Sequence, residues 1–460
     1  MKILFNSPRL SSGKYNNIDD FVRDNKIELD PQVEILPVYR ASFRSPEWID
    51  KVVHFSLDGQ DYSMSKEDDE KLRRSNNGKK LLSRYLHDKF QLNNVVVLAG
   101  SGMSMSLNNS TQDETSEYNF LAPSMTDLWI AATKWEYLHK TEEFEKVVTI
   151  KDICEILEME YKDDKILNIE DFLSLCNGYC QFRTSKADFL HYVKTFKDYI
   201  VKEIIRLTNF VDKVPEENWR AHTNFLRKLC SYRQKDKDDN ERLKVFTTNY
   251  DMAIEVAASK NEFIVLDGFK VFPPHRFSPH NIYNLDFYNK RKSINGNIVR
   301  AEDVIYLYKI HGSVNWYKND KGEIFKDSKV DLSRFETNSN ITPLIVCPSK
   351  DKYEETNDSP YNEMMDYFKD SLSISNSVLI CIGFGFNDKH INSVIKRSLE
   401  KNEDLSVIVV APNLLEKQSS INPEMKELLL QYMCNSKDER IMFVDSTFGE
   451  FNGYMEELIN

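Results

Sequence analysis

Short apolar runs recur along this chain, and most of them end in a cluster of glycine or polar residues. A clear example is NNVVVLAGSGMSMS at residues 93–106, where four apolar residues lead directly into a glycine turn. An apolar run of this length, followed at once by a turn, is typical of a buried parallel strand. After residue 240 similar runs return, at residues 243–251, 263–269, 303–312, 341–349, 377–388, 405–412 and 440–446.

Residues 125–235 follow a helical period instead. The clearest segment is SKADFLHYVKTFKDYIVKEIIRL at residues 185–207. Its apolar side chains recur every three or four positions, as on an amphipathic helix that faces a core. One strand precedes this helical block and the others follow it. We therefore interpret residues of about 135–235 as an insertion into a single domain.

The order of strands and helices predicts an α/β fold, namely a Rossmann-like doubly wound parallel sheet with a helical insertion and an N-terminal extension. The extension would cover residues 1–90, whose role the residues do not reveal. Within it, VEILPVYRASF and KVVHFSLDGQDYSM are expected to be strands. The main domain would cover residues 91–460.

Charge and composition narrow the possible partners. A formal net charge of −12, with no long lysine or arginine block, gives no strong signal for nucleic-acid binding. No segment has the ~20 apolar residues that span a bilayer. The start, MKILFNSPRLSSGK, has too short an apolar stretch for a secretory signal, so we expect a cytoplasmic protein. The seven cysteines are scattered without a CxxC pair, which favours reduced core thiols over a zinc ribbon.

Four polar clusters follow apolar runs, and the first of them is AGSGMS. Glycine lets a backbone approach a pyrophosphate closely, and a helix that begins there favours an anion. The spacing is neither GxGxxG nor a P-loop, so a plain Gly-Ser turn explains the segment about as well. The candidate cofactor-binding residues of this cluster are Gly100, Ser101, Gly102 and Ser104.

The second and third clusters supply an amide and an imidazole. In FTTNYD, Asn249 follows a strand and can hold a water or a ribose hydroxyl. A helix cap by Asn249 or Asp251 explains the same segment equally well. In YKIHGS, His311 follows a strand and can take a proton from a hydroxyl or a water. A lone histidine at a strand end is more often structural. His311 would share a sheet edge with Asn249, however, and this placement favours a role for His311 as a general base.

The fourth cluster is CIGFGFND, which follows the strand SVLICI. Glycine at a strand end admits a sugar or a base close to the backbone. The asparagine and the aspartate can bond ribose hydroxyls or cap the next helix. His390 follows shortly afterwards, and we interpret it as a surface or packing residue of that helix. The candidate cofactor-binding residues here are Gly383, Gly385, Asn387 and Asp388.

These clusters predict one shared crevice. The carboxyl ends of neighbouring parallel strands meet at one edge of a sheet, where dinucleotides bind. The crevice would hold a base but no metal ligands, because the chain contains no HExxH and no Cys/His metal spacing. The first turn lacks GxGxxG and an acidic residue downstream, which argues against a conventional dehydrogenase.

The motifs GSGMS, TTNYD, KIHGS and GFGFND resemble, in this order, those of sirtuin-like domains. The chain is more similar still to the sirtuin-like NADases of bacterial antiphage defence, especially those paired with a HerA-type ATPase. That resemblance spans residues of about 93–455. It is carried by the segments NIEDFLS, FTTNYDMAIEVAA, DGF with HRFSPHNIY, YKIHGSVNWY and GFGFNDKHIN.

The resemblance implies that residues 91–460 form a sirtuin-like NAD-binding catalytic domain. Its activity would be NAD hydrolysis to nicotinamide and ADP-ribose, with NAD as the substrate and no metal. His311 and Asn249 look like the catalytic residues of that family. Asp251 looks like a residue that supports the pocket. The cluster AGSGMS looks like the loop on the phosphate side of NAD. The cluster CIGFGFND looks like the turn beside the adenosine.

The chain also departs from the classical sirtuin deacylases. It has no four-cysteine zinc module, and MSLNNSTQDETSEYNFLAPSMTDLW stands where they carry a GIPDFR-type segment. A deacylase would need an acyl-lysine channel beside the zinc module, so deacylation is the weaker alternative. A second alternative is a nucleotide-sensing or structural subunit without catalysis, which would keep the glycine turns and not depend on His311.

Regulation is expected because unrestrained NAD hydrolysis would poison the cell that makes the enzyme. The resemblance implies a homo-oligomer and a HerA-type ATPase partner, although another activating protein or nucleotide would serve the same purpose. The N-terminal extension and the helical insertion are the candidate contact surfaces. The resemblance thus implies a regulated, NAD-depleting effector of antiphage defence.

Overall fold

The computed structural model describes most of the chain after residue 85 and four two-residue strands before it. The strands predicted at residues 33–43 and 51–64 lie largely outside the described residues. The described residues are 4–5, 42–43, 56–57, 60–61, 86–108, 122–140, 145–162, 166–182, 187–233, 241–271, 273–281, 287–289, 298–300, 303–330, 340–347, 359–414, 421–435 and 440–458.

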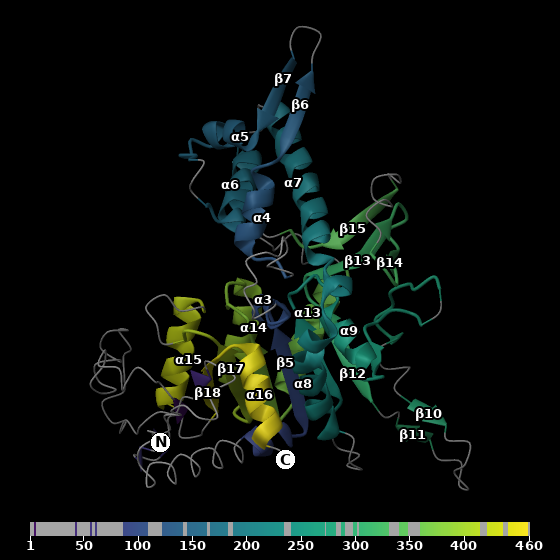
Figure 1. The fold of residues 1–460 in the computed structure, drawn as a ribbon, viewed down its shortest axis with the longest axis vertical. Coiled ribbons are helices and arrows are strands. Elements are labelled where there is room, and N and C mark those ends of the chain that lie inside the picture. Colours follow the sequence, from purple (N-terminus) through teal and green to yellow (C-terminus); the bar gives the residue numbers. More distant parts are fainter. Residues whose placement is uncertain are drawn as a thin grey trace.

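A parallel sheet forms the centre of the molecule (Figure 1). Within the described chain it has nine strands, in the order β1-β18-β17-β16-β5-β8-β12-β9, with β2 beside β18. Each strand pairing in this sheet of the described residues is parallel, which confirms the predicted α/β class. The bounds are β1 Leu4–Phe5, β2 Ser42–Phe43, β5 Asn94–Ala99, β8 Leu243–Thr247, β9 Ile264–Leu266, β12 Val304–Lys309, β16 Ser377–Ile382, β17 Leu405–Ala411 and β18 Ile441–Ser446.

The strand order contains a topological switch point. From β5 the chain moves outward through β8 to β12, and it then crosses back to β16 and moves outward through β17 to β18. The order β12-β8-β5-β16-β17-β18 is that of a dinucleotide-binding Rossmann sheet, whose ligands bind beyond the carboxyl ends of the strands where the direction reverses. In this protein that point lies between β5 and β16, so the sheet confirms the doubly wound prediction.

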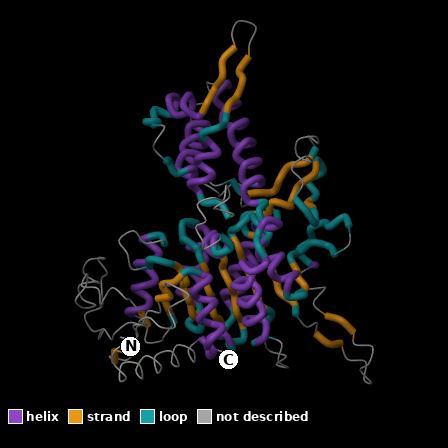
Figure 2. Tube along the Cα trace, in the orientation of Figure 1, coloured by secondary structure: helices purple, strands orange, loops and turns teal. Residues whose placement is uncertain are grey.

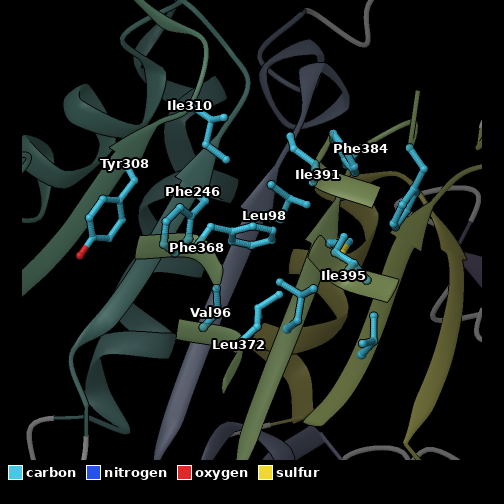
Figure 3. Packing of buried hydrophobic residues seen from close by; sticks show 14 of the residues in the cluster. Val96, Leu98, Phe246, Tyr308, Ile310, Phe368, Leu372, Phe384, Ile391 and Ile395 are labelled. Atoms are coloured by element: carbon cyan, nitrogen blue, oxygen red, sulfur yellow. The ribbon is translucent and has the colours of Figure 1, made fainter. Parts of the chain in front are cut away.

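Both faces of the sheet are covered by helices, which explains the continuous apolar runs. Val96 and Leu98 of β5 pack on one face, among residues of three helices (Figure 3). These helices are α13 (Tyr361–Ser373), α14 (Lys389–Lys401) and α15 (Pro423–Asn435). Val95 and Val97 point to the opposite face. That face is covered by α8 (Arg220–Ser231), α9 (Ala253–Lys260) and α16 (Phe448–Leu458).

A helical body lies between β5 and β8 and projects from the sheet (Figures 1 and 2). It has its own core, to which α7 contributes Phe189, Val193 and Phe196 at the predicted helical spacing. Next along the chain, α8 packs on the sheet and not in this body. The elements of the body are α4 (Met125–Ala132), β6 (Glu136–Lys140), β7 (Glu145–Thr149), α5 (Ile150–Ile156), α6 (Ile169–Phe182) and α7 (Ala187–Thr208).

A small antiparallel sheet follows β12, in the order β14-β13-β15. The segment at residues 341–349 forms the strand β15, but in this small sheet and not in the parallel one. Its bounds are Ile341–Ile345, and those of its neighbours are Gly312–Asn319 for β13 and Ile324–Lys326 for β14. Two-stranded pairs complete the described strands: β3 (Ser56–Leu57) with β4 (Gln60–Asp61), β6 with β7, and β10 (Phe287–Asn289) with β11 (Ile298–Arg300).

None of the helices in the described part of the chain is long and apolar enough to cross a membrane.

His222 of α8 is buried behind the turn that follows β5. Its ring packs edge-on against Phe448, with 5.0 Å between the ring centroids. Neither ring nitrogen of His222 reaches a hydrogen-bond partner among the described residues. Burial lowers the pKa of His222 to about 3, and the nearby backbone of Met103 opposes this shift only in part. The folded protein therefore keeps this imidazole neutral.

The low pKa of His222 makes stability depend on pH. Below the ordinary histidine pKa of 6.5 the unfolded chain binds a proton that the folded chain does not accept until about pH 3. The free energy of unfolding is therefore expected to fall by about 1.4 kcal/mol per pH unit across that window. His222→Leu removes the titrating group, so wild type should lose stability relative to this variant as the pH drops. Thermal unfolding of both proteins at about pH 7.5 and about pH 5 tests this, and a constant difference between them would contradict it.

Candidate active site

The turns after β5 and β16 pack backbone to backbone at the switch point. The amide of Gly100 donates to the carbonyl of Ile382 at 2.9 Å, and the amide of Gly102 donates to the carbonyl of Gly383 at 3.0 Å. Gly383 has a φ of +56°, a conformation that side chains disfavour. These glycines therefore let the turn after β5 lie directly against the turn after β16. The turn after β5 leads into α3 (Ser101–Met105).

The first turn is joined to the β8 turn through the side chain of Asn249. Its Nδ2 donates to the carbonyl of Gly100 at 2.8 Å and to Oγ of Ser104 at 2.9 Å. Ser104 Oγ in turn donates to Oδ2 of Asp251 at 2.8 Å, and Oδ1 of Asp251 accepts the amide of Ala253. Because Nδ2 is held by two acceptors, the orientation of the Asn249 amide is set, and Oδ1 is the atom that can accept from a ligand.

A buried lysine holds the β8 turn in place from β12. The Lys309 side chain is 1% exposed, and its Nζ donates to the backbone carbonyl of Asp251 and to Oε1 of Glu255 at 3.0 Å. The same ammonium reaches the carbonyl of Tyr250 at 3.3 Å, and that carbonyl also accepts the amide of Val314. Lys309 therefore ties the turn that carries Asn249 to the end of β12, two residues before His311.

His311 follows β12 and is paired with Asp388, which follows β16. His311 Nε2 and Asp388 Oδ2 are 3.0 Å apart, and the two side chains are only 6% and 7% exposed. The backbone carbonyl of His311 accepts the amide of Val346 at 2.9 Å, so the residue is also held by the segment after β15. The imidazole therefore has a fixed position at the carboxyl edge of the sheet.

Gly312 makes the chain turn sharply beside His311. Its φ is +85°, and a Cβ atom there would lie 2.1 Å from the carbonyl oxygen of Leu344. Only glycine fits this close approach, which sends β13 out of the parallel sheet and into the antiparallel one.

A cavity of about 280 Å³ opens where these turns meet. Its volume is close to the lower end of the usual range of ligand pockets, about 300–1,000 Å³. The sheet edge contributes the predicted residues Gly100, Ser101, Ser104, Asn249, Asp251, His311, Gly385, Asn387 and Asp388. Gly102 and Gly383 do not line the cavity, and their contacts are those of the packed turns.

The opposite wall of the cavity comes from the helical insertion. Apolar side chains of α4 and α7 face the sheet edge across the cavity, together with the carboxylate residue Glu170 of α6. The insertion residues are Ser124, Met125, Leu128, Glu170, Ile204, Leu207 and Thr208. The cavity thus lies between the sheet edge and the insertion, with an acidic residue on the insertion side.

Sequence reasoning missed several residues of this site. Glu170 lies in the motif NIEDFLS, which carried the resemblance but suggested no role for the glutamate. Lys309 is the one charged residue in an otherwise apolar strand. Because a lysine is rarely fully buried unless it is paired, this position could have indicated a buried ion pair. His390 lines the cavity instead of lying only on the surface of α14. Within the described chain, no group of three or more His, Cys, Asp or Glu residues is arranged to hold a metal ion.

Comparison with known proteins relates part of the chain to a family. Residues 243–434 match the family described as SIR2-like domain. The matched region contains Asn249, Asp251 and His311 as well as the turn after β16, but not the glycine turn after β5. No curated protein sequence is significantly similar to the chain.

Similar solved structures include sirtuins. One comes from work on the structural basis of sirtuin substrate affinity; it is 13% identical, with 82% of this chain and 98% of that chain covered and a TM-score of 0.36. Another is described as Sir2 with a p53 peptide and NAD⁺; it is 11% identical, with 81% and 96% of the two chains covered and a TM-score of 0.34.

Proposed function

We propose that this protein cleaves the nicotinamide–ribose bond of NAD and releases nicotinamide and ADP-ribose. The observation that carries the proposal is that Asn249 and His311, both within the SIR2-like region, line one cavity at the switch point of a Rossmann sheet. NAD-related chemistry is what a SIR2-like domain suggests in general, and dinucleotides bind at this position in such sheets.

The reaction needs an oriented ribose and an activated water. Nicotinamide is a cationic group on an anomeric carbon, so its departure with the bonding electron pair produces a transition state with oxocarbenium character. Water then forms the new bond to that carbon and loses a proton. Oδ1 of Asn249 is suited to accept a hydrogen bond from a ribose hydroxyl or from this water. His311 is suited to take the proton.

Hydrolysis rather than deacylation is favoured by the lining of the site. The side of the cavity opposite the sheet is lined by apolar residues of α4 and α7, such as Leu128 and Leu207. The chain also has no four-cysteine module beside which an acyl-lysine channel would form. Glu170 lines the same wall, and its carboxylate would attract the positively charged nicotinamide ring of a bound substrate.

We also propose that the activity is held in check in the cell, as a cytoplasmic effector of antiphage defence that works as a homo-oligomer with a HerA-type ATPase or another activator. The insertion supports a role in assembly, because it exposes many large apolar side chains. They are Met125, Ile130, Leu138, Val147, Ile166, Leu175 and Leu190. Leu138 and Val147 face each other across the β6–β7 hairpin, each about half exposed.

Nicotinamide release tests the proposal. Purified protein is incubated with NAD, alone and with the protein encoded next to it, and nicotinamide and ADP-ribose are followed by chromatography. Equal amounts of the two products are expected. Asn249→Asp should abolish release, because a carboxylate oxygen would then face the carbonyl of Gly100 and add a charge beside Asp251. Bound NAD without release would instead indicate a nucleotide-binding subunit, and release only with an acetylated peptide would indicate a deacylase.

A further inference from the structure

Both carboxylate oxygens of Asp388 have partners in the protein. Oδ1 accepts the amides of His390 and Ile391 at 2.9 and 3.1 Å and so caps the N-terminus of α14. Oδ2 lies 3.0 Å from Nε2 of His311. The two helix amides prevent the carboxylate from rotating, and Oδ2 is thereby aimed at the imidazole.

The turn that carries Asp388 is itself braced. Nδ2 of Asn392 donates to the carbonyl of Phe386 at 2.7 Å, across the first turn of α14. Phe386 has a φ of +55°, and its side chain is fully buried in the core. The aspartate therefore stands on a rigid connection between β16 and α14, which is the kind of support that holds a reacting group in one geometry.

From this geometry we infer that Asp388 is a positioning residue for His311. The inference rests on the proposed function, in which His311 is the base. An ionised carboxylate only accepts hydrogen bonds, so the proton between the two residues belongs to Nε2 of His311. The lone pair of a neutral ring is then on Nδ1, and Nδ1 is the atom that accepts the proton from water or from a ribose hydroxyl. Asp388 thus selects the tautomer and the orientation of the base.

The alternative is that Asp388 binds a ribose hydroxyl of NAD, as the sequence motif suggests. Its contacts favour the positioning role. Both carboxylate oxygens already accept hydrogen bonds from the protein, and the side chain is 7% exposed. The neighbouring Asn387 is exposed and lines the same cavity, so it is better placed for the substrate.

Asp388→Asn tests the contact with His311 separately from the cap of α14. An asparagine caps a helix about as well as an aspartate, so the amide oxygen of the substituted side chain can keep the two amides of α14. The amide nitrogen of that side chain then faces His311 and can only donate, which forces the proton of the ring from Nε2 to Nδ1. The matched control is Asp152→Asn. Asp152 likewise accepts a backbone amide at a helix start and pairs with a base, Lys146, but it lies in the insertion at α5.

The experiment combines kinetics with nitrogen NMR. Nicotinamide release is measured under the condition in which wild type is active, and the ring nitrogens are observed in protein with ¹⁵N-labelled histidine, where a His311→Gln sample identifies the His311 signals. For Asp388→Asn we expect an unchanged melting temperature, a kcat lower by about 10²–10⁴-fold with little change in KM, and a His311 proton moved from Nε2 to Nδ1. Asp152→Asn should change none of these.

Two results would overturn the inference. One is a folded Asp388→Asn protein with the kcat of wild type, and the other is the same His311 tautomer in both proteins. The NMR readout needs no turnover, so it keeps the two proposals separate. If wild type released no nicotinamide under any condition, the proposed function would be wrong, while the tautomer comparison would still decide whether Asp388 orients His311.

Discussion

His311→Gln is expected to lower the rate of nicotinamide release by about 10²–10⁴-fold, the usual contribution of a general base. Glutamine can still donate a hydrogen bond from its amide toward Oδ2 of Asp388, the atom that His311 contacts at 3.0 Å. It cannot accept a proton. Alanine would be a poorer choice, because it would leave the buried carboxylate of Asp388 unpaired and destabilise the fold for an unrelated reason.

The measurement is a time course of nicotinamide and ADP-ribose, with circular dichroism and thermal unfolding to show that the variant is folded. NAD binding should change much less than kcat, because the lost group acts in the transition state and not on the bound substrate. His87→Gln is the matched control, since His87 is a solvent-exposed histidine whose side chain is 45% exposed. Undiminished NAD cleavage by a folded His311→Gln protein would refute the assignment of the base.

Gly383→Ala is expected to disrupt the site by separating the two packed turns. A Cβ atom on Gly383 would lie 2.5 Å from the amide nitrogen of Met103 and 2.6 Å from the carbonyl carbon of Gly102. Both are backbone atoms, so no side-chain rotation relieves the clash. The φ of +56° adds strain for any residue with a side chain. We expect a loss of roughly 2–4 kcal/mol of stability and a marked loss of NAD affinity.

Thermal unfolding and calorimetric titration with NAD measure the two effects of Gly383→Ala. Gly178→Ala serves as the control, because Gly178 lies in α6 and, apart from its chain neighbours and the nearby backbone of its own helix, no atom lies within 4 Å of the added methyl group. Alanine in a helix interior should leave stability unchanged or raise it slightly. If Gly383→Ala melts and binds NAD like wild type, the close packing of the β5 and β16 turns does not shape the site.

The main sheet could be predicted from the sequence because its strands are buried on both faces. Such strands read as uninterrupted apolar runs, and β5, β8, β16 and β17 all lie within the predicted segments. The runs of β5, β8 and β16 also end in polar clusters that the structure brings to the carboxyl edge. The helical spacing of α7 was equally clear, since its buried residues form one stripe.

The partners of a strand were harder to predict. Residues 341–349 are as apolar as the central strands, but β15 pairs with β13, because Gly312 sends the chain out of the parallel sheet. An apolar run indicates burial and does not specify the neighbour. The helical spacing at residues 185–207 likewise predicted only a helix that faces a core. Two residues of this helix, Ile204 and Leu207, also line the cavity.

The pairing of His311 with Asp388 was beyond prediction from single motifs. The two residues are 77 positions apart, and each stands in a segment with a sufficient local explanation, a turn for one and a helix cap for the other. The clusters predicted that both segments end at the same edge of the sheet, but only the structure shows that the two side chains meet there. The role of Lys309 likewise depends on three backbone and side-chain acceptors that belong to the β8 turn and to α9.

The switch point also sets the order in which the site is completed during synthesis. Gly100 follows β5, the first strand of the Rossmann core to leave the ribosome, whereas Gly383 and Asp388 follow β16, which is made after β8 and β12. The cavity needs both turns. Every chain that stops short of Asp388 therefore lacks part of the site. Under the proposed function, a prematurely terminated chain could not hydrolyse NAD, and late completion of the site would add a safeguard to the proposed regulation by a partner.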